Sequence, residues 1–386
     1  MGCSPKTNYR SNTFQKMKQK FCILFISMVL FHLSAHAQSL KWNSPIEAGY
    51  PVIDGRYWQT GLKNTYDRLP GNAQENVRKE LWELSQNSAG EYITFTTDAR
   101  EIRVKYQVNG SYIIPNSTAL NVSGVDLYAQ DIKNNWHWIS GKYDLGDTIR
   151  FQFSNISAPL PIKEYRLYLP LYKTPSWIKI GVASTAAFQF QKVNEKEKPV
   201  VIYGTSILQG ASSSRPGLAW SNILGRRLNT RVINLGFSGN GQLESPLIDL
   251  ISQIEASLYI LDCMPNLYDR NKFSDEEVEK RITSSVKSLQ QKHPHTPILL
   301  TEHSGALPGL NLDSSITSKY THVSQVLSAT FYKLRKEGIK NIYLLKAQKI
   351  GFTYDSTIDG THPNDIGMIQ YANAYEEIIK QILKKK

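Results

Sequence analysis

The sequence is poor in cysteine, with three among its 386 residues. Cys3 and Cys22 lie in an N-terminal segment that we expect to be removed, which leaves Cys263 alone. One cysteine forms no intramolecular disulfide, so a disulfide-stapled scaffold is excluded. The fold must depend on packed hydrophobic cores, and a chain of this length fits two domains that each bury one.

The sequence also lacks the charge clusters that indicate a nucleic-acid partner. The formal net charge is +12, and it falls to +7 without residues 1–37, which contain five basic and no acidic residues. Part of the remainder is the lysine tail at 384–386, and no run of arginines is interleaved with aromatic residues. We therefore expect no nucleic-acid partner. No histidine and cysteine group has metal-ligand spacing, so we expect neither a metal nor a cofactor.

Long apolar runs are equally scarce. A run of 13 residues at 21–33 follows several basic residues and precedes Ala35-His36-Ala37. It is too short to span a bilayer, and with the A-x-A pattern it predicts a signal peptide over residues 1–37, cleaved near Ala37. An N-terminal membrane anchor is the alternative, although no cysteine for a lipid anchor follows, and translation starting at Met17 also stays open. We expect an exported protein without stable membrane insertion; periplasmic, surface-held and released forms stay open.

Residues 38–195 are predicted to form an all-β domain. Alternating apolar and polar residues, typical of half-buried strands, are separated by turn residues. The expected strands are 92–96, 102–106, 126–129, 149–153 and 165–169. Only 71–86 has a helical pattern in this part of the sequence. Short strands with such turns indicate an antiparallel sandwich.

Residues 199–386, after a charged linker at 195–199, are predicted to form an α/β domain. Short continuous apolar runs are typical of parallel strands covered on both faces. The expected strands are 200–203, 231–235, 258–261, 298–301 and 342–345. Helical patterns alternate with them, including one after the capping box at 274–277, one ending near Gly338 and one after Pro363. This order predicts a doubly wound parallel sheet, in which ligands bind at the carboxyl ends of the strands.

Ser206 directly follows the first of these strands, and Gly204 permits a sharp turn there. A serine at a tight strand-to-helix turn resembles a nucleophile elbow, although G-x-S-x-G is absent. A turn or helix N-cap serine is the plainer alternative. Asp359 and His362, in a loop after the last strand, would supply an orienting carboxylate and a base. Taken alone, each residue has a plainer alternative role. Asp359 could cap the following helix, and His362, one of six histidines after residue 37, could be structural or solvated.

Two other strand ends offer hydrogen-bond donors. Gly239 lies in a glycine-containing loop after the second strand, and Asn266 lies just after the third. A backbone N–H and a side-chain amide can form an oxyanion hole together with the N–H of Ser206. A plain turn at Gly239 and a capping role for Asn266 are the alternatives.

These four segments, in this order along one sheet, resemble the blocks of the SGNH (GDSL-type) hydrolase family. The resemblance implies a flavodoxin-like sheet with Ser206 as nucleophile, Gly239 and Asn266 as oxyanion donors, and Asp359 and His362 as acid and base. Thr205 stands where the family usually has aspartate, so hydrogen bonding around the turn should differ. Residues 124–128, Gly-Val-Asp-Leu-Tyr, resemble the GxDLY signature of the jelly-roll-like module that precedes one bacterial branch of the family.

The resemblance implies a secreted serine esterase that removes acetyl or other small acyl groups from carbohydrates through an acyl-enzyme. An acyl hydrolase of the lipase or thioesterase kind, on a small non-sugar ester, is one alternative, and a non-catalytic glycan-binding protein is another. Arg215, His303 and Tyr354 are candidate substrate-binding residues near the site. Trp136, Trp138 and Trp220 are candidates for stacking on sugars, although core packing is the plainer role of each. The oligomeric state stays open.

Overall fold

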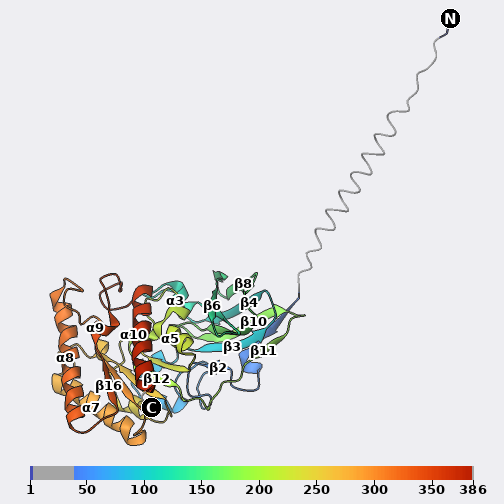
Figure 1. Ribbon diagram of the computed structural model, residues 1–386. Helices are drawn as coiled ribbons and strands as arrows, with labels where there is room; N and C mark the ends of the chain where they lie inside the picture. The colour runs from blue at the N-terminus through green and yellow to red at the C-terminus, as the bar shows by residue number, and fades with distance from the viewer. Residues whose placement is uncertain (3–38, 385–386) are drawn as a thin grey trace. The chain divides into compact units, whose positions relative to one another are not determined.

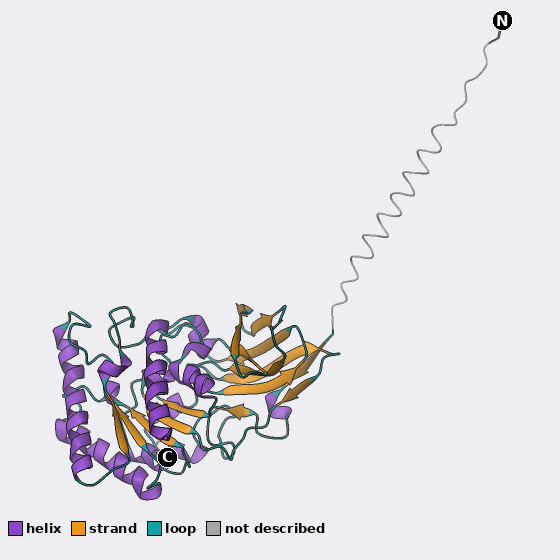
Figure 2. Ribbon diagram, viewed as in Figure 1, coloured by secondary structure: helices purple, strands orange, loops and turns teal. Residues whose placement is uncertain are grey.

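Strands in the first half of the chain form two antiparallel sheets packed as a sandwich (Figures 1 and 2). The computed structural model describes residues 1–2 and 39–384, so nearly all of the predicted signal peptide lies outside the described residues. One sheet has the order β1-β10-β4-β8-β7, and the other has the order β11-β3-β9-β5-β6 with β2 beside β3. The strands are β1 (Leu40–Asn43), β2 (Ile53–Asp54), β3 (Tyr92–Thr97), β4 (Ile102–Val108), β5 (Asp126–Asp131), β6 (Trp136–Ile139), β7 (Lys142–Leu145), β8 (Ile149–Phe153), β9 (Ile162–Tyr168), β10 (Pro175–Ala183) and β11 (Phe188–Phe190).

The alternating pattern of these strands decides which face is buried. In β4, Ile102, Val104 and Tyr106 are buried, whereas Arg103 between them is exposed. The buried side chains belong to one apolar cluster with residues of the opposite sheet such as Leu127. The predicted all-β sandwich is therefore confirmed.

The second half of the chain builds a parallel five-stranded sheet in the order β13-β12-β14-β15-β16. Its strands are β12 (Val200–Gly204), β13 (Val232–Gly236), β14 (Leu258–Asp262), β15 (Ile298–Thr301) and β16 (Ile342–Leu345). The first three are buried along their whole length, as their continuous apolar sequences predict. After β12 the chain adds β13 on one side of it, and then adds β14, β15 and β16 on the other side. The strand order therefore changes direction between β12 and β14, and ligands bind at such a switch point in doubly wound folds.

Helices cover both faces of this sheet (Figure 2). One face packs against α6, α7 and α8, and the other packs against α5 and α10. The helices are α2 (Lys79–Ser85), α3 (Ala119–Ser123), α4 (Ser206–Gln209), α5 (Trp220–Leu228), α6 (Ser245–Ile251), α7 (Asp275–Lys292), α8 (Ser314–Lys336), α9 (Ala347–Ile350) and α10 (Asp365–Lys384), with 3-10 helices η1 (Pro45–Glu47), η2 (Gly71–Glu75), η3 (Pro216–Leu218) and η4 (Met264–Asn266). The doubly wound α/β fold is confirmed.

Two expectations about helices were wrong in detail. The helical pattern at 71–86 is split into η2 and α2, and the residues between them are not helical. The β-rich half also contains α3, whose start is capped by Thr118. At five residues it is too short to show a helical period.

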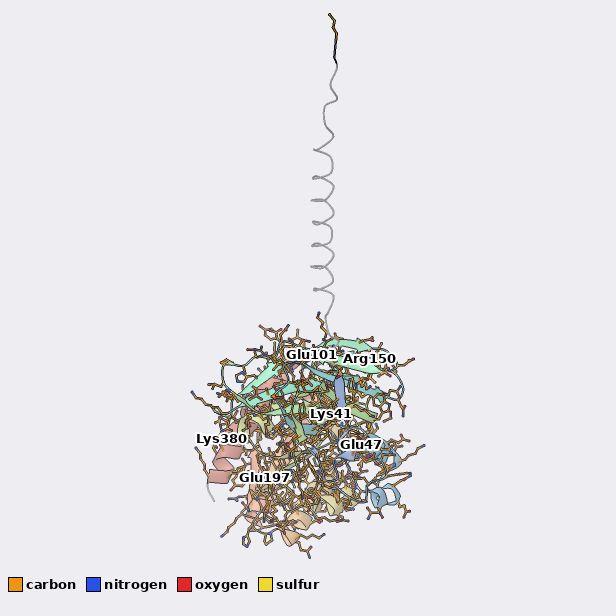
Figure 3. The ribbon with its side chains drawn as sticks, turned by 90° about the vertical axis from the view of Figure 1, so that its right-hand side faces the viewer. Lys41, Glu47, Glu101, Arg150, Glu197 and Lys380 are labelled. Carbon is orange, nitrogen blue, oxygen red and sulfur yellow. The ribbon has the colours of Figure 1, made fainter. Side chains whose placement is uncertain are left out.

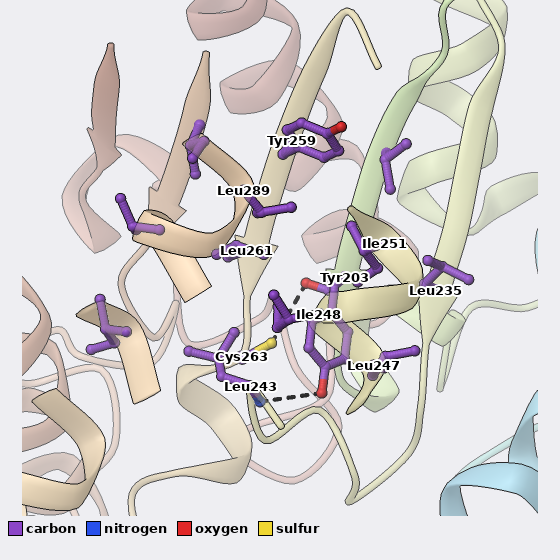
Figure 4. Packing of buried hydrophobic residues seen from close by; sticks show 14 of the residues in the cluster. Tyr203, Leu235, Leu243, Leu247, Ile248, Ile251, Tyr259, Leu261, Cys263 and Leu289 are labelled. Carbon is purple, nitrogen blue, oxygen red and sulfur yellow. Dashed lines mark hydrogen bonds between the residues drawn. The ribbon is translucent and has the colours of Figure 1, made fainter. Parts of the chain in front are cut away.

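The larger core of the α/β sheet lies between β12–β16 and the helices α6, α7 and α8 (Figure 4). Tyr203 crosses this core, and its hydroxyl accepts a hydrogen bond of 3.1 Å from the Leu243 backbone N–H. The Cys263 thiol donates to the Tyr203 carbonyl at 3.6 Å and is fully buried. Because Cys263 packs as a small apolar residue, it belongs to the core rather than to a reactive site.

A buried carboxylate joins the sandwich to the α/β sheet. Asp126, the acidic residue of the GxDLY segment, forms an ion pair with Arg215. It also accepts hydrogen bonds from Trp138 Nε1 at 2.7 Å and from the Gly217 backbone N–H at 2.9 Å. A Cβ on Gly217 would lie 2.5 Å from this carboxylate, so glycine is needed for the close approach. Apart from its contribution to the fold, the pentapeptide thus forms a contact with the segment that follows Ser206.

Arg68 makes a second link between the two halves. Its buried guanidinium donates to the carbonyl of Gly236, at the end of β13, at 2.8 Å, and to the carbonyls of Leu84 and Asn87 at 2.7 Å each. Burial lowers the Arg68 pKa to about 10. From Trp42 onward the chain forms one compact unit, so the domain boundary at 195–199 stays a prediction.

Some charged side chains on the outside form ion pairs with their neighbours. Glu101, labelled in Figure 3, accepts a hydrogen bond of 2.6 Å from Arg103, and Lys380 on α10 pairs with Glu376 at 2.5 Å. Such exposed pairs contribute little to stability, on the order of 0–1 kcal/mol each. Within residues 39–384, every helix is too short or too polar to cross a membrane.

Candidate active site

Ser206 is the first residue of α4 and follows β12 after a single intervening residue, Thr205. The Thr205 hydroxyl caps this helix by accepting from the Ile207 N–H at 3.3 Å. The hydroxyl therefore serves as the helix cap at the position where the family usually has aspartate. A Cβ on Gly204 would lie 2.9 Å from the Asp262 carbonyl, so glycine allows β12 and β14 to approach closely there. Ser206 is 5% exposed.

A hydrogen-bonded chain runs from Ser206 to Asp359. The Ser206 Oγ lies 2.9 Å from His362 Nε2, and the opposite ring nitrogen, Nδ1, lies 2.7 Å from Asp359 Oδ2. Ser206 at the start of α4 and the loop that carries Asp359 and His362 are about 150 positions apart in the sequence, and they meet at the carboxyl edge of the sheet. A proton on Nδ1, donated to the carboxylate, leaves Nε2 free to accept the serine proton.

The Asp359 carboxylate is held by its own loop. Its Oδ1 accepts from the backbone N–H groups of His362 at 2.8 Å and Thr361 at 3.0 Å. Partial burial acts to raise its pKa, but the hydrogen bonds from the His362 side chain and backbone outweigh burial and lower the pKa well below the usual range. Gly360 has a φ of +83°, and a Cβ there would lie 2.7 Å from Asn311 Nδ2, so the turn between the two residues requires glycine.

Donors from two other strand ends lie in the loops expected for them. Asn266, in η4, has its Oδ1 engaged by the Gly241 N–H at 2.9 Å, which fixes the orientation of its amide. Gly239 has a φ of +71° in the loop after β13, where the neighbouring Ser238 N–H is taken by Gln209 Oε1 at 2.9 Å. Among residues 39–384, no acceptor engages Asn266 Nδ2 or the N–H groups of Ser206 and Gly239. These three donors are therefore available to a ligand.

His303 lies behind this chain rather than at its surface. Its ring is fully buried and stacks on Tyr320 with centroids 3.6 Å apart, and Nδ1 accepts from the Gly305 N–H at 2.9 Å. Burial, together with the nearby His362, lowers the His303 pKa to about 3, so this ring stays neutral. The Tyr320 hydroxyl contacts Thr361 Oγ1 at 2.5 Å, which connects the stacked pair to the loop of His362. With its ring inaccessible to solvent, His303 gains no support as a substrate-binding residue.

The other candidate substrate residues have different surroundings. Arg215 is held by Asp126 and by the Tyr128 hydroxyl at 2.7 Å, so its contacts are structural ones. Tyr354 is 81% exposed, and its role in substrate binding stays a prediction.

The three tryptophans also differ in their surroundings. Trp220 has the core-packing role that was the plainer of its two alternatives, because it is fully buried and stacks on Tyr375 with ring centroids 4.4 Å apart. Trp136 packs against the Arg166 guanidinium, and Trp138 stacks against that of Arg215.

One contact at the site was missed in the sequence. Asn116, from the β-rich half, places its Nδ2 3.3 Å from His362 Nδ1 and 3.5 Å from Asp359 Oδ2. The only local signal was the turn-forming pair Pro115-Asn116, which gives no indication of a partner almost 250 residues away. Within the described residues, no group of three His, Cys, Asp or Glu side chains is arranged to hold a metal ion.

Comparisons with known proteins identify the family and the fold. Residues 197–380 match the profile of the GDSL-like lipase/acylhydrolase family, and residues 40–188 match the N-terminal GxDLY domain of SGNH-hydrolase-type esterases. A crystal structure from Bacteroides ovatus, described as a GDSL-like lipase, is 32% identical with a TM-score of 0.79, over 90% of this chain and 98% of its own. No curated protein sequence matches the chain.

Two more distant structures share the fold over the same extent, 90% of this chain and 98% of theirs. A salicylyl acyltransferase from a tetracycline biosynthetic pathway is 18% identical with a TM-score of 0.68. A family two carbohydrate esterase from Cellvibrio japonicus is 12% identical with a TM-score of 0.51. The fold and the identity to the Bacteroides ovatus structure over nearly its full length lead to one conclusion: the chain belongs to the GDSL-like lipase/acylhydrolase (SGNH hydrolase) family, with a GxDLY N-terminal domain.

Proposed function

We propose that the protein is a serine esterase that removes acetyl or other small acyl groups from carbohydrates, with Ser206, His362 and Asp359 as its catalytic triad. The observation that supports this proposal is the continuous hydrogen-bonded chain from the Ser206 hydroxyl through His362 to the Asp359 carboxylate. The family to which the chain belongs is that of GDSL-like lipases and acylhydrolases, and the three side chains have the chemistry required of a nucleophile, a base and an orienting carboxylate.

The proposed reaction has two halves. His362 Nε2 takes the proton from Ser206 Oγ, which attacks the ester carbonyl carbon, while Asp359 stabilises the imidazolium. The carbonyl oxygen, now an oxyanion, accepts hydrogen bonds from the N–H groups of Ser206 and Gly239 and from the Asn266 amide. When the tetrahedral intermediate collapses, the alcohol leaves with the proton from His362 and an acyl-enzyme remains. Water, deprotonated by His362, then attacks the acyl group, and the acid and Ser206 are released.

A polar side chain beside the triad favours a substrate with hydroxyl groups over one with only alkyl groups there. The Asn311 amide nitrogen lies close to Gly360, in the loop that joins Asp359 and His362. A substrate hydroxyl group can exchange hydrogen bonds with this amide, whereas an alkyl chain would leave it unpaired.

A lipase-like activity on a non-sugar ester is a second candidate, because the 32% identical structure is described as a GDSL-like lipase. The test compares acetate release from acetylated xylan with hydrolysis of p-nitrophenyl acetate and p-nitrophenyl octanoate. We expect activity on the acetylated glycan and the acetate ester, and little on octanoate. Preference for octanoate would support the lipase-like candidate instead.

The catalytic assignment is tested with Ser206→Ala and with Ser284→Ala as control, because Ser284 lies exposed on α7. We expect Ser206→Ala to lower kcat by at least about 10³-fold and the control to match the wild type. A Ser206→Ala protein with full activity would refute the triad. Glycan binding by both variants without any turnover by the wild type would instead favour a binding protein.

We also propose that the protein is exported after cleavage near Ala37, since the basic and apolar segments of residues 1–37 have the pattern of a signal peptide. N-terminal sequencing of the protein recovered from the medium or periplasm should begin near Gln38. Recovery of an intact N-terminus from the membrane fraction would indicate an anchor.

A further inference from the structure

The Asp359 and His362 pair is contacted by a residue of the GxDLY domain. Asn116 Nδ2 donates to Asp359 Oδ2 at 3.5 Å and lies 3.3 Å from His362 Nδ1. Its amide therefore sits beside the hydrogen bond that joins these two side chains. Asp359 already accepts two backbone N–H bonds on its other oxygen, so the Asn116 amide acts on the one oxygen that serves His362.

The backbone around Asn116 is built to present this side chain. Ile114 and Ser117 pair as an isolated antiparallel bridge, with Pro115 and Asn116 between them. Proline at the first central position and a positive φ at the second, +62° for Asn116, are the pattern of a type II turn. Asparagine is among the few residues other than glycine that adopt this conformation readily. The turn tip thus carries a side chain with both a donor and an acceptor.

The turn is fixed to the segment that follows α4. The Asn116 carbonyl accepts from Ser212 Oγ at 2.7 Å, and the Thr118 hydroxyl donates to the Ser214 carbonyl at 2.8 Å. Asn121, in α3, donates to the Gly210 carbonyl at 2.8 Å. Because Gly210 lies at the end of the short helix that starts with Ser206, these bonds tie the position of Asn116 to that of the serine.

We propose that Asn116 is a positioning residue through which the GxDLY domain completes the active site of the other domain. It holds the Asp359 carboxylate in the rotamer that receives the His362 Nδ1 proton, and it tunes the basicity of that carboxylate. This inference rests on the proposed function, since it assigns a role within the same triad. With this role for Asn116, the β-rich half contributes to catalysis and is more than a binding module.

The effect of the amide on basicity has a defined sign. A neutral donor on Asp359 Oδ2 stabilises the carboxylate and draws electron density from the bond to His362, so the imidazolium is stabilised less. An acidic residue at position 116 would do the opposite, because a second negative charge within about 4–6 Å of a ring stabilises its protonated form. The pH at which the enzyme loses activity on the acidic side therefore reports on position 116.

The experiment uses the full chain with Asn116→Gly and Asn116→Asp. Glycine keeps the positive φ and removes the amide, whereas aspartate keeps the shape and adds charge. Asn155→Gly is the matched control, because Asn155 also has a positive φ, +57°, and is exposed in the loop after β8. Thermal unfolding of each variant shows whether it is folded, and the pH dependence of kcat/KM is measured from pH 4 to 9.

We expect Asn116→Asp to move the acidic limb of kcat/KM upward by about one pH unit. Asn116→Gly should lower kcat by about 10-fold with KM changed less than twofold, and Asn155→Gly should match the wild type. The proposal is overturned if both Asn116 variants fold and keep the wild-type pH profile and kcat. A change confined to KM would also overturn it, since this would make Asn116 a substrate contact.

A failure of this inference is distinguishable from a failure of the proposed function. A fluorophosphonate probe, which reacts with activated serines, should label the wild type and not Ser206→Ala. Suppose that labelling depends on Ser206 but that the Asn116 variants keep the wild-type kcat and pH profile. The esterase proposal would then stand, and Asn116 would have no role in it. Wild-type protein that resists the probe and turns over no ester would reject both.

Discussion

Asp126 of the GxDLY segment and Arg215 of the loop after Ser206 form an ion pair in which the carboxylate is 4% exposed and the guanidinium 20%. Burial acts to raise the Asp126 pKa above its usual value, although Arg215 and Trp138 oppose this. The donors from Arg215, Trp138 and Gly217 thus offset the desolvation of the carboxylate only in part, because its pKa stays raised. Removing only one partner would leave the other charge buried and uncompensated.

We expect Arg215→Ala to lower the free energy of unfolding by about 3 kcal/mol, measured by chemical denaturation. Arg150→Ala is the control, because Arg150 pairs with Asp144 across 3.7 Å with both side chains well exposed. Its change should stay within about 0.5 kcal/mol. Equal effects of the two substitutions would show that the Asp126 contact has no special importance.

The buried Asp262 at the end of β14 predicts an unusual pH dependence. Burial raises its pKa to about 7, although a 3.1 Å hydrogen bond from the Tyr375 hydroxyl opposes the rise. Between about pH 4 and 7 the native state then binds more protons at this site than the unfolded state does, so stability contributed by Asp262 falls as the pH rises through this window. Asp262→Asn, which stays neutral, should raise Tm more at pH 8 than at pH 5.

The control for this prediction is Asp249→Asn, since Asp249 is an exposed residue of α6. Its effect on Tm should be the same at both pH values. A destabilising effect of Asp262→Asn that is equal at pH 5 and pH 8 would mean that Asp262 is ionised throughout this range.

Asp359→Asn tests the carboxylate without changing the shape of the loop. The low pKa of Asp359 means that it stays charged over the working range, so its removal should affect activity at every pH from 5 to 9. We expect kcat to fall by about 10³–10⁴-fold because the amide favours the wrong tautomer of His362. The measurement is p-nitrophenyl acetate hydrolysis. Recovery of activity at high pH would indicate that only the protonation state of His362 matters.

The sequence predicted those parts of the fold that depend on local patterns. β8, β15 and β16 have the expected bounds, because their apolar residues are continuous or strictly alternating between clear turns. The edge strands β6 and β7 were not predicted, since partly exposed strands carry a weak pattern and depend on pairing with distant segments.

The same distinction applies to the candidate site. Ser206 and His362 were proposed from the sequence because each lies at a strand end or in a loop with a recognisable spacing. Asn116 and Tyr320 were not, because their importance arises only when remote segments meet. Arg215 was expected at the mouth of the site, and its partner Asp126 was seen only as part of a signature. Tertiary contacts, rather than local sequence, decide the role of both.

Asn266→Ala tests the oxyanion donors. Asn266 Oδ1 is engaged by the Gly241 N–H, so the substitution removes both a candidate donor and an anchor of the glycine loop. We expect kcat to fall by about 10²–10³-fold while KM for p-nitrophenyl acetate changes little, because the interaction is stronger in the transition state than with bound substrate. Asn271→Ala, at an exposed position shortly after η4, is the control. A rise in KM with kcat unchanged would place Asn266 in ground-state binding rather than in stabilising the oxyanion.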